Sequence, residues 1–154
     1  MNARRLGVLT ACAASLLPLL AWARPADDKV ETFTGKVLPL ADLVAKSGSR
    51  LDGDAAPHWL ALVTDDGKVY PLVKDTGARM FFKDPALLNR PMRLSGKFLP
   101  GSQVLRVISV RSLKKGEPCE VYYWCDVCAI RRSEKDICEC CGGPMRLVEE
   151  PVKK

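Results

Sequence analysis

Cys125-Asp126-Val127-Cys128 and Cys138-Glu139-Cys140-Cys141-Gly142-Gly143 are the two segments around which the rest of this 154-residue chain is organised. Each contains a Cys-x-x-Cys pair, and nine residues separate the two pairs. A Cys-x-x-Cys turn brings two sulfur atoms close enough to bind one metal ion, and two such turns supply the four ligands of a tetrahedral site. The spacing therefore predicts a Zn²⁺ site whose ligands are Cys125, Cys128, Cys138 and Cys141.

The second segment has Gly142 directly after its last cysteine. Glycine lets the backbone turn back over the site, where its N–H groups can hydrogen-bond a thiolate. This half of the motif resembles the knuckles of zinc-ribbon and rubredoxin-type proteins, and the resemblance implies a small module stabilised by metal. The first segment departs from that pattern, because Ala129 stands where a glycine is common.

Three arrangements of the six cysteines from Cys119 onward stay open. In the first, four cysteines bind zinc, or Cu(I), which also suits thiolates. Cys119 and Cys140 then form a disulfide, stay free or act as alternate ligands. In the second, all six form three disulfides, which is usual in an oxidising compartment. In the third, Cys125 and Cys128 act in redox chemistry or metal transfer.

The third arrangement has a local resemblance behind it. Trp124 to Cys128 resembles the Trp-Cys-x-x-Cys segment of thioredoxins, in which a strand-to-helix site lowers the pKa of the first thiol. Only 26 residues follow Cys128, which is too few for the remaining elements of that fold. The six cysteines are therefore interpreted first as structural. A module as small as residues 116–148 cannot bury enough apolar surface to fold without such support.

The N-terminal residues have the pattern of a signal peptide, residues 1–23. Arg4 and Arg5 precede a nearly unbroken apolar run over residues 6–20, and residues 21–23 offer a small-x-small cleavage site. The run is short for a membrane span. The residues up to Cys12 also resemble a lipoprotein acylation site, but the apolar run continues past that cysteine. We expect an exported protein, periplasmic or secreted, without a membrane span after cleavage.

The charge balance adds a mild preference for anionic partners. The formal net charge of +6 falls to +4 once residues 1–23 are removed with their two arginines. Basic residues are scattered among aspartates, as on an ordinary solvated surface. The partner expected from these observations is an unidentified protein or an anionic ligand. Nucleic acid is not expected, because the exported compartment lacks it, and the sequence leaves the oligomeric state open.

Residues 31–115 form the main body, which follows a short flexible segment at 24–30 and contains no cysteine. Apolar and polar residues alternate in several runs, and Asp66-Gly67 is a strong hairpin signal. Asp84 as N-cap and Pro85 at the first helical position indicate a short helix. The runs expected as strands are 31–40, 59–64, 68–73, 92–98 and 104–110, with the short helix at 84–89.

This order resembles the OB-fold, a five-stranded Greek-key barrel with a helix between its third and fourth strands. OB-folds often bind ligands on aromatic side chains, which implies four candidate ligand-binding residues. Packing in the core is the simpler explanation for several of them. These candidates are Trp59, Tyr70, Phe81 and Phe82.

As a whole, the chain resembles secreted bacterial proteins that combine such a barrel with a zinc-ribbon-like module, a resemblance that implies no activity. The fold expected is mainly β: a small five-stranded OB-like barrel, the Cys-rich module at 116–148 and a tail at 149–154. A strand at 120–124 leads into the first Cys pair of the module. No motif for a nucleophile, a phosphate loop or paired catalytic carboxylates stands out. The function expected is a non-enzymatic binding or scaffold protein with a structural Cys₄ metal site. The alternatives are a periplasmic thiol redox or metal-transfer protein and a disulfide-stapled module on a ligand-binding barrel.

Overall fold

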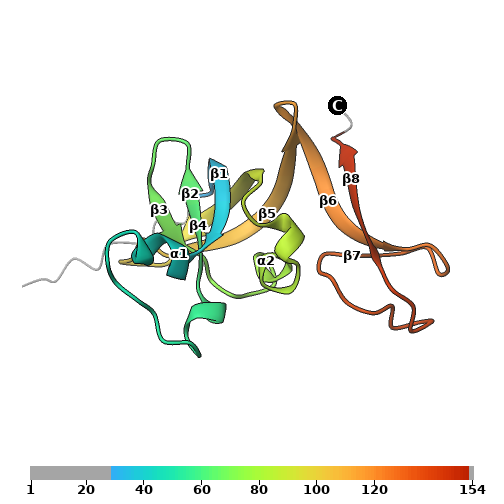
Figure 1. The fold of residues 1–154 in the computed structure, drawn as a ribbon. Helices are drawn as coiled ribbons and strands as arrows, with labels where there is room; N and C mark the ends of the chain where they lie inside the picture. Colours follow the sequence, from blue (N-terminus) through green and yellow to red (C-terminus); the bar gives the residue numbers. More distant parts are fainter. Residues whose placement is uncertain (1–28, 153–154) are drawn as a thin grey trace, which may run out of the picture.

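The structure is a computed structural model that describes residues 29–152 (Figure 1). The expected signal peptide, Cys12 and residues 24–28 lie outside the described residues, as do the last two residues. Within residues 29–152, no helix combines the length and the apolar character needed to cross a membrane. The described chain is mainly β, as expected, and its helical segments are short.

Eight strands and four helical segments make up the described chain. The strands are β1 (Glu31–Pro39), β2 (Leu60–Thr64), β3 (Val69–Pro71), β4 (Pro91–Phe98), β5 (Leu105–Lys114), β6 (Glu117–Cys125), β7 (Ile130–Arg132) and β8 (Arg146–Pro151). The α-helices are α1 (Leu40–Ala45) and α2 (Arg79–Lys83), and the 3₁₀ segments are η1 (Ala56–His58) and η2 (Pro85–Leu87).

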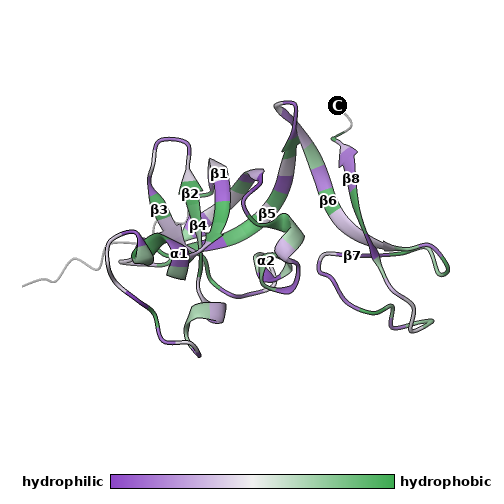
Figure 2. Cartoon of the chain, in the orientation of Figure 1, coloured by the Kyte–Doolittle hydropathy of each residue, from purple (hydrophilic) through white to green (hydrophobic). Residues whose placement is uncertain are grey.

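The alternation seen in the sequence sets which face of each strand is buried. In β4, Met92 and Leu94 are fully buried, whereas Arg93 between them is only half-buried. Hydrophobic and hydrophilic bands alternate in the same way along β5 (Figure 2). The Asp-Gly turn joins β2 to β3 with Gly67 at φ +83°, a conformation that glycine adopts without strain. The predicted hairpin is confirmed.

Gly35 lies where β1 packs closely against β2. A Cβ atom at this position would lie 2.1 Å from the carbonyl oxygen of Val63, so glycine is required by the close approach of β2. The pairing of β4 with β5 has a register shift between Ser95 and Gly96.

The helical region before β4 is split in two. Asp84 is the predicted N-cap, and its side chain accepts a hydrogen bond from the N–H of Ala86 at 3.2 Å, but only the 3₁₀ segment η2 follows. The α-helix α2 precedes it and was not predicted. This helix buries Met80 and Phe81 in the core.

The five-stranded barrel is not confirmed. The strands form one eight-stranded sheet in the order β3-β2-β1-β4-β5-β6-β7, with β8 also paired to β6. The chain leaves β5 through a turn at 115–116 and returns as β6, so the sheet continues past the expected domain boundary into the Cys-rich module. A parallel bridge joins Leu72, after β3, to Leu105 at the start of β5.

The body and the Cys-rich module share one hydrophobic core. The buried cluster contains Leu62 and Phe81 from the body together with Tyr123, Cys125 and Cys138 from the module. Residues 149–151, expected in a frayed tail, instead end β8 and pair with β6. Glu149 is held there by Arg90 at 2.5 Å and Lys114 at 3.0 Å, partners far away in the sequence.

Candidate metal centre

The fold brings the four predicted ligands together at one end of the sheet. The Sγ atoms of these cysteines all lie within 4.8 Å of one another. Cys125 ends β6, and Cys138 lies after β7 in the loop that leads to β8; each is 1% exposed. Cys128 is half-buried and Cys141 is exposed. The site therefore has a closed inner half and an outer half that faces solvent.

The two Cys-x-x-Cys segments form the same turn. The N–H of Ala129 donates to the carbonyl oxygen of Cys125 at 2.9 Å, and the N–H of Gly142 donates to that of Cys138 at 2.7 Å. Both donors have a left-handed backbone, with φ of +53° at Ala129 and +68° at Gly142. Ala129 thus replaces glycine without changing the turn. An alanine in this conformation costs about 1–2 kcal/mol.

Backbone N–H groups point at the sulfur atoms and favour thiolates. The N–H groups of Cys141 and Cys140 lower the pKa of the Cys138 thiol to about 7. For Cys125, the N–H of Cys128 acts in the same direction, but burial and two neighbouring thiols together raise its pKa. The thiols of Cys140 and Cys141 raise the pKa of Cys128. Several thiols crowded together resist ionisation unless a cation neutralises them.

The donor set fits a divalent zinc ion. Four sulfur atoms at about 2.3 Å from Zn²⁺ in a tetrahedron are about 3.8 Å apart, close to the 3.5 Å between the sulfur atoms of Cys125 and Cys141. Backbone N–H groups around the sulfur atoms supply the outer hydrogen bonds that such sites use. Bound there, the ion would hold the two loops together and leave no open position for catalysis.

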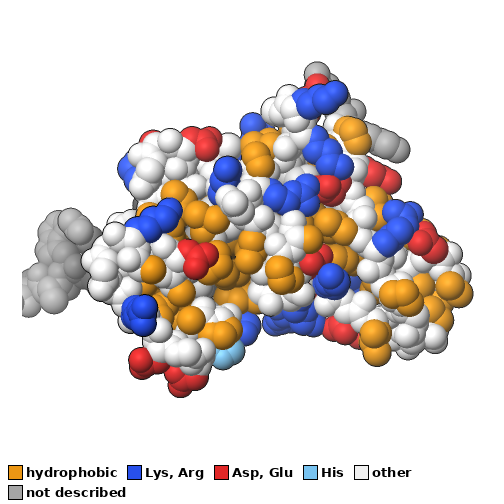
Figure 3. All heavy atoms as spheres, in the orientation of Figure 1, with side chains coloured by type: hydrophobic (Ala, Val, Ile, Leu, Met, Phe, Trp, Pro, Cys, Tyr) orange, Lys and Arg blue, Asp and Glu red, His pale blue; other side chains and the backbone are white. Residues whose placement is uncertain are grey.

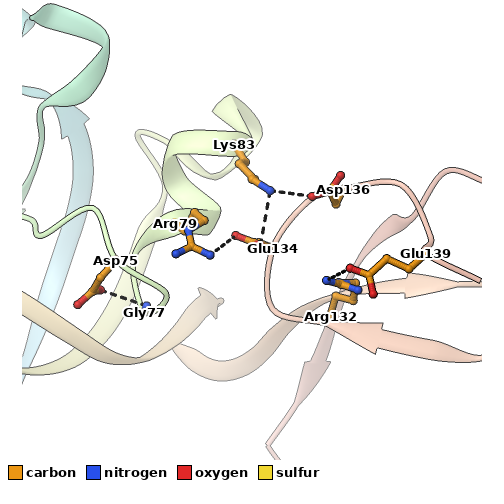
Figure 4. Close-up of polar contacts among 8 residues, drawn as sticks. All are labelled: Asp75, Gly77, Arg79, Lys83, Arg132, Glu134, Asp136 and Glu139. Carbon is orange, nitrogen blue, oxygen red and sulfur yellow. Dashed lines mark hydrogen bonds and ion pairs between the residues drawn. The ribbon is translucent and has the colours of Figure 1, made fainter. Parts of the chain in front are cut away.

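Each loop also carries an acid that pairs with an arginine on a neighbouring strand. Asp126, in the first Cys pair, accepts from Nε of Arg146 on β8 at 2.9 Å. Glu139, in the second pair, binds Arg132 on β7 at 2.7 Å (Figure 4). The hydrogen bond and charge of Arg132 lower the pKa of Glu139. These pairs link both turns to the sheet from outside the cysteine cluster.

The two remaining cysteines are not brought together. Cys119 is buried on β6, six residues before Cys125, which is roughly 20 Å along a strand. Cys140 is exposed beside the four clustered cysteines. All six cysteines of the described chain are free thiols, and no disulfide joins Cys119 to Cys140.

The loop between the two Cys pairs docks on α2. Lys83 lies 2.8 Å from Asp136 and 3.5 Å from Glu134 (Figure 4). Arg79, one turn earlier on α2, lies 3.5 Å from Glu134. Each exposed pair contributes at most about 1 kcal/mol. Together these ion pairs position the second Cys pair relative to the body. Because their partners lie far apart in the sequence, no local motif predicts them.

Asp84 provides a second, more buried link. It is 3% exposed, and it accepts hydrogen bonds from the hydroxyl of Tyr123 at 2.8 Å and from Nζ of Lys135 at 3.1 Å. Tyr123 lies on β6 two residues before the first ligand, and Lys135 lies in the connecting loop. The capping residue predicted for a short helix thus also anchors the Cys-rich module to the body.

The four aromatic candidates do not form one surface. Phe81 is 1% exposed and belongs to the core, and Tyr70 packs with Phe33 and Phe98 at ring-centroid distances of 5.2 and 5.0 Å. Phe82 is half-buried, with Lys74 5.2 Å above its ring. Trp59 is 44% exposed. The last ring alone is open to a stacking ligand among these four.

The tips of the Cys-rich module expose apolar side chains. Val127 is 81% exposed in the first Cys loop, and Ile137 is 64% exposed beside the second. Hydrophobic side chains gather over this end of the molecule in Figure 3.

Comparison with protein-family models, with curated proteins and with solved structures gives no match.

Proposed function

We propose that the chain is an exported, non-enzymatic binding or scaffold protein whose C-terminal module is held in place by one structural Zn²⁺. One observation carries the metal site: four sulfur atoms within 4.8 Å of one another, presented by two loops of the same geometry. Structural zinc sites have four protein ligands and no open position, and this set supplies four. The apolar run and cleavage pattern of residues 1–23 support export.

The test compares two variants with the native protein. Cys125→Ser/Cys138→Ser removes the two buried ligands, and Cys140→Ser removes an exposed thiol next to the site. We expect the double variant to lose zinc and to unfold at a lower temperature, because the binding free energy of a structural metal is also folding free energy. The control should keep both its zinc and its unfolding temperature.

A second measurement separates loss of metal from loss of packing at the two buried positions. Zinc added to the metal-stripped native protein should raise its unfolding temperature, and it should leave that of Cys125→Ser/Cys138→Ser unchanged. Retention of zinc and stability by the double variant would refute the structural site.

The exposed outer half of the site favours a second candidate function, thiol exchange or metal transfer. Cys128 is half-buried, Cys141 is exposed, and Cys140 adds a fifth thiol beside them. An incoming chelator or thiol could reach the metal from that side. This function requires rapid transfer of zinc to a soluble chelator and slower transfer in Cys140→Ser. Transfer that takes days in both proteins would leave only the structural role.

For the body, we propose that β1 to β5 close into an OB-like barrel. The parallel bridge from Leu72 to Leu105 supports this, as does the hydrogen bond from the N–H of Val73 to the carbonyl oxygen of Leu105 at 3.0 Å. Hydrogen exchange tests the closure. The amide of Val73 should be protected to the same degree as the amides of β1, and rapid exchange there would mean an open sheet.

A further inference from the structure

The outward face of β4 and β5 places two arginines directly opposite each other. Arg93 and Arg111 are cross-strand partners, and so their side chains leave the sheet on the same face. The residues beside them, Met92 and Ser112, are fully buried and face the core. Both arginines are half-buried. Two guanidinium groups therefore project side by side from the middle of the sheet.

Neither guanidinium has an acidic partner within residues 29–152. The acid opposite Arg111 is Glu120 on β6, but its carboxylate binds Arg131 at 3.0 Å. The residue opposite Arg93 on β1 is Thr34, which carries no charge. Like charges directly opposite each other in a sheet lower stability. An anion that lies between the two cations would stabilise this arrangement.

The side chains around the arginine pair are mainly hydroxyls and further cations. Thr32 and Ser95 hydrogen-bond each other at 2.9 Å, and Ser109 lies opposite Ser95. Lys36, two residues beyond Thr34 on β1, is exposed on the same face. This face offers charge-assisted bonds to an oxyanion and hydroxyls that can hydrogen-bond a hydroxyl-rich chain.

We propose that this face binds an acidic polysaccharide, with one sulfate or carboxylate group of the chain held between Arg93 and Arg111. The flanking hydroxyls contact neighbouring sugar hydroxyls along the strands. A single-stranded nucleic acid would need aromatic rings on which its bases can stack. The nearest ring on this face, Tyr122, is 8% exposed and covered by the guanidinium of Arg131, 4.0 Å from its centroid.

Binding is measured with the zinc-loaded protein at low ionic strength against four probes. Dextran sulfate carries sulfate groups, polygalacturonate carries carboxylates, neutral dextran carries neither, and an oligoadenylate carries phosphates and bases. We expect binding to dextran sulfate or polygalacturonate and no binding to neutral dextran. The stronger of the two acidic probes identifies the oxyanion.

The variant Arg93→Gln/Arg111→Gln tests the arginine pair. It should bind the preferred acidic probe about tenfold more weakly, with the slope of log affinity against log salt reduced by about two, one for each lost contact. The control Lys46→Gln/Arg50→Gln removes the same charge from exposed positions between α1 and η1 and should bind within about twofold of the native protein. The unfolding temperature of the test variant, without ligand, should equal or exceed that of the native protein, because a like-charge contact is removed.

Three results would overturn the proposal. The first is absence of binding to both acidic polysaccharides. The second is an equal loss of affinity in the test and control variants, which would mean that only net charge matters. The third is tighter binding of oligoadenylate than of either polysaccharide, which would favour a nucleic acid partner.

Discussion

The carboxylate of Asp84 accepts a hydrogen bond from the hydroxyl of Tyr123 at 2.8 Å, and this contact joins the end of α2 to the strand that carries the first Cys pair. Both groups are buried, with Tyr123 fully excluded from solvent. Burial and the hydrogen bond to Asp84 raise the pKa of Tyr123, so this hydroxyl remains a donor at any ordinary pH. The Cys-rich module is thus attached to the body through a charged hydrogen bond inside the core.

Removing either side of this contact should lower the free energy of unfolding. We expect Tyr123→Phe and Asp84→Asn to cost about 1–3 kcal/mol each, because a hydrogen bond to a charged group is lost in the interior. The double variant should cost less than the sum of the two, since they share one interaction. Urea unfolding of the four proteins measures this. Strict additivity would mean that the two residues act independently.

The contribution of Asp84 should depend on pH. Burial raises the pKa of its carboxyl, but the hydrogen bonds from Tyr123, Lys135 and the N–H of Ala86 outweigh it, and the net pKa lies below its usual range. A carboxyl with a lowered folded-state pKa stabilises the protein above its unfolded pKa of about 4, and that stability is lost as the pH falls through the folded-state pKa.

The stability difference between the native protein and Asp84→Asn should therefore be largest at neutral pH and shrink as the pH falls below about 4. Comparing the two proteins at each pH cancels changes that affect both, including loss of metal. A difference that stays constant from pH 7 to pH 3 would show that the ionised carboxylate contributes nothing.

Because the two Cys loops form the same turn, exchanging alanine and glycine at the equivalent positions should change the stability of the protein in opposite directions. Ala129→Gly should stabilise the zinc-loaded protein and Gly142→Ala should destabilise it, each by about 1 kcal/mol, because a left-handed φ strains alanine and not glycine. A Cβ on Gly142 meets nothing within 4 Å, so its effect comes from the backbone alone. Thermal unfolding compares the pair, and changes of the same sign would rule out equivalent turns.

Gly77 should not tolerate a side chain. A Cβ atom there would lie 1.8 Å from the carbonyl oxygen of Val107 on β5, so the segment before α2 would have to move away from the sheet. Gly77→Ala should cost about 1–3 kcal/mol, as overpacking usually does. Gly53→Ala, at an open position with ordinary φ, is the matched control and should change stability by less than about 0.5 kcal/mol.

The sequence was most informative where the physics is local. Cys-x-x-Cys spacing predicted the four clustered sulfur atoms, period-two alternation predicted β1 and β4, and Asp-Gly between two apolar runs predicted the β2–β3 hairpin. Asp84 was recognised as an N-cap because capping needs only residues close in the chain. Its bonds to Tyr123 and Lys135 join elements 39 and 51 residues apart, so no local pattern could show them.

Tertiary contacts explain the features that were missed. The charged residues at the end of β8 resemble a tail in the sequence. In the structure the side chain of Glu149 is only 11% exposed, and its ion pairs with Arg90 and Lys114 offset the cost of burying its charge. The helix α2 has no side-chain N-cap, so nothing in its sequence marks a start. The sequence did not predict the same turn in both Cys loops, because alanine rarely adopts a left-handed backbone. The backbone angle of Ala129 shows that the turns are equivalent.

The mass of the intact native protein, purified without chelator from cells that express the full chain, tests the central claim most directly. The proposed structure predicts one zinc per chain, and six cysteines that become alkylated once the metal is removed, without any reductant. A mass with no metal, together with six cysteines that resist alkylation until they are reduced, would contradict it. The module would then be held by three disulfides, and the clustered thiols would not be a metal site.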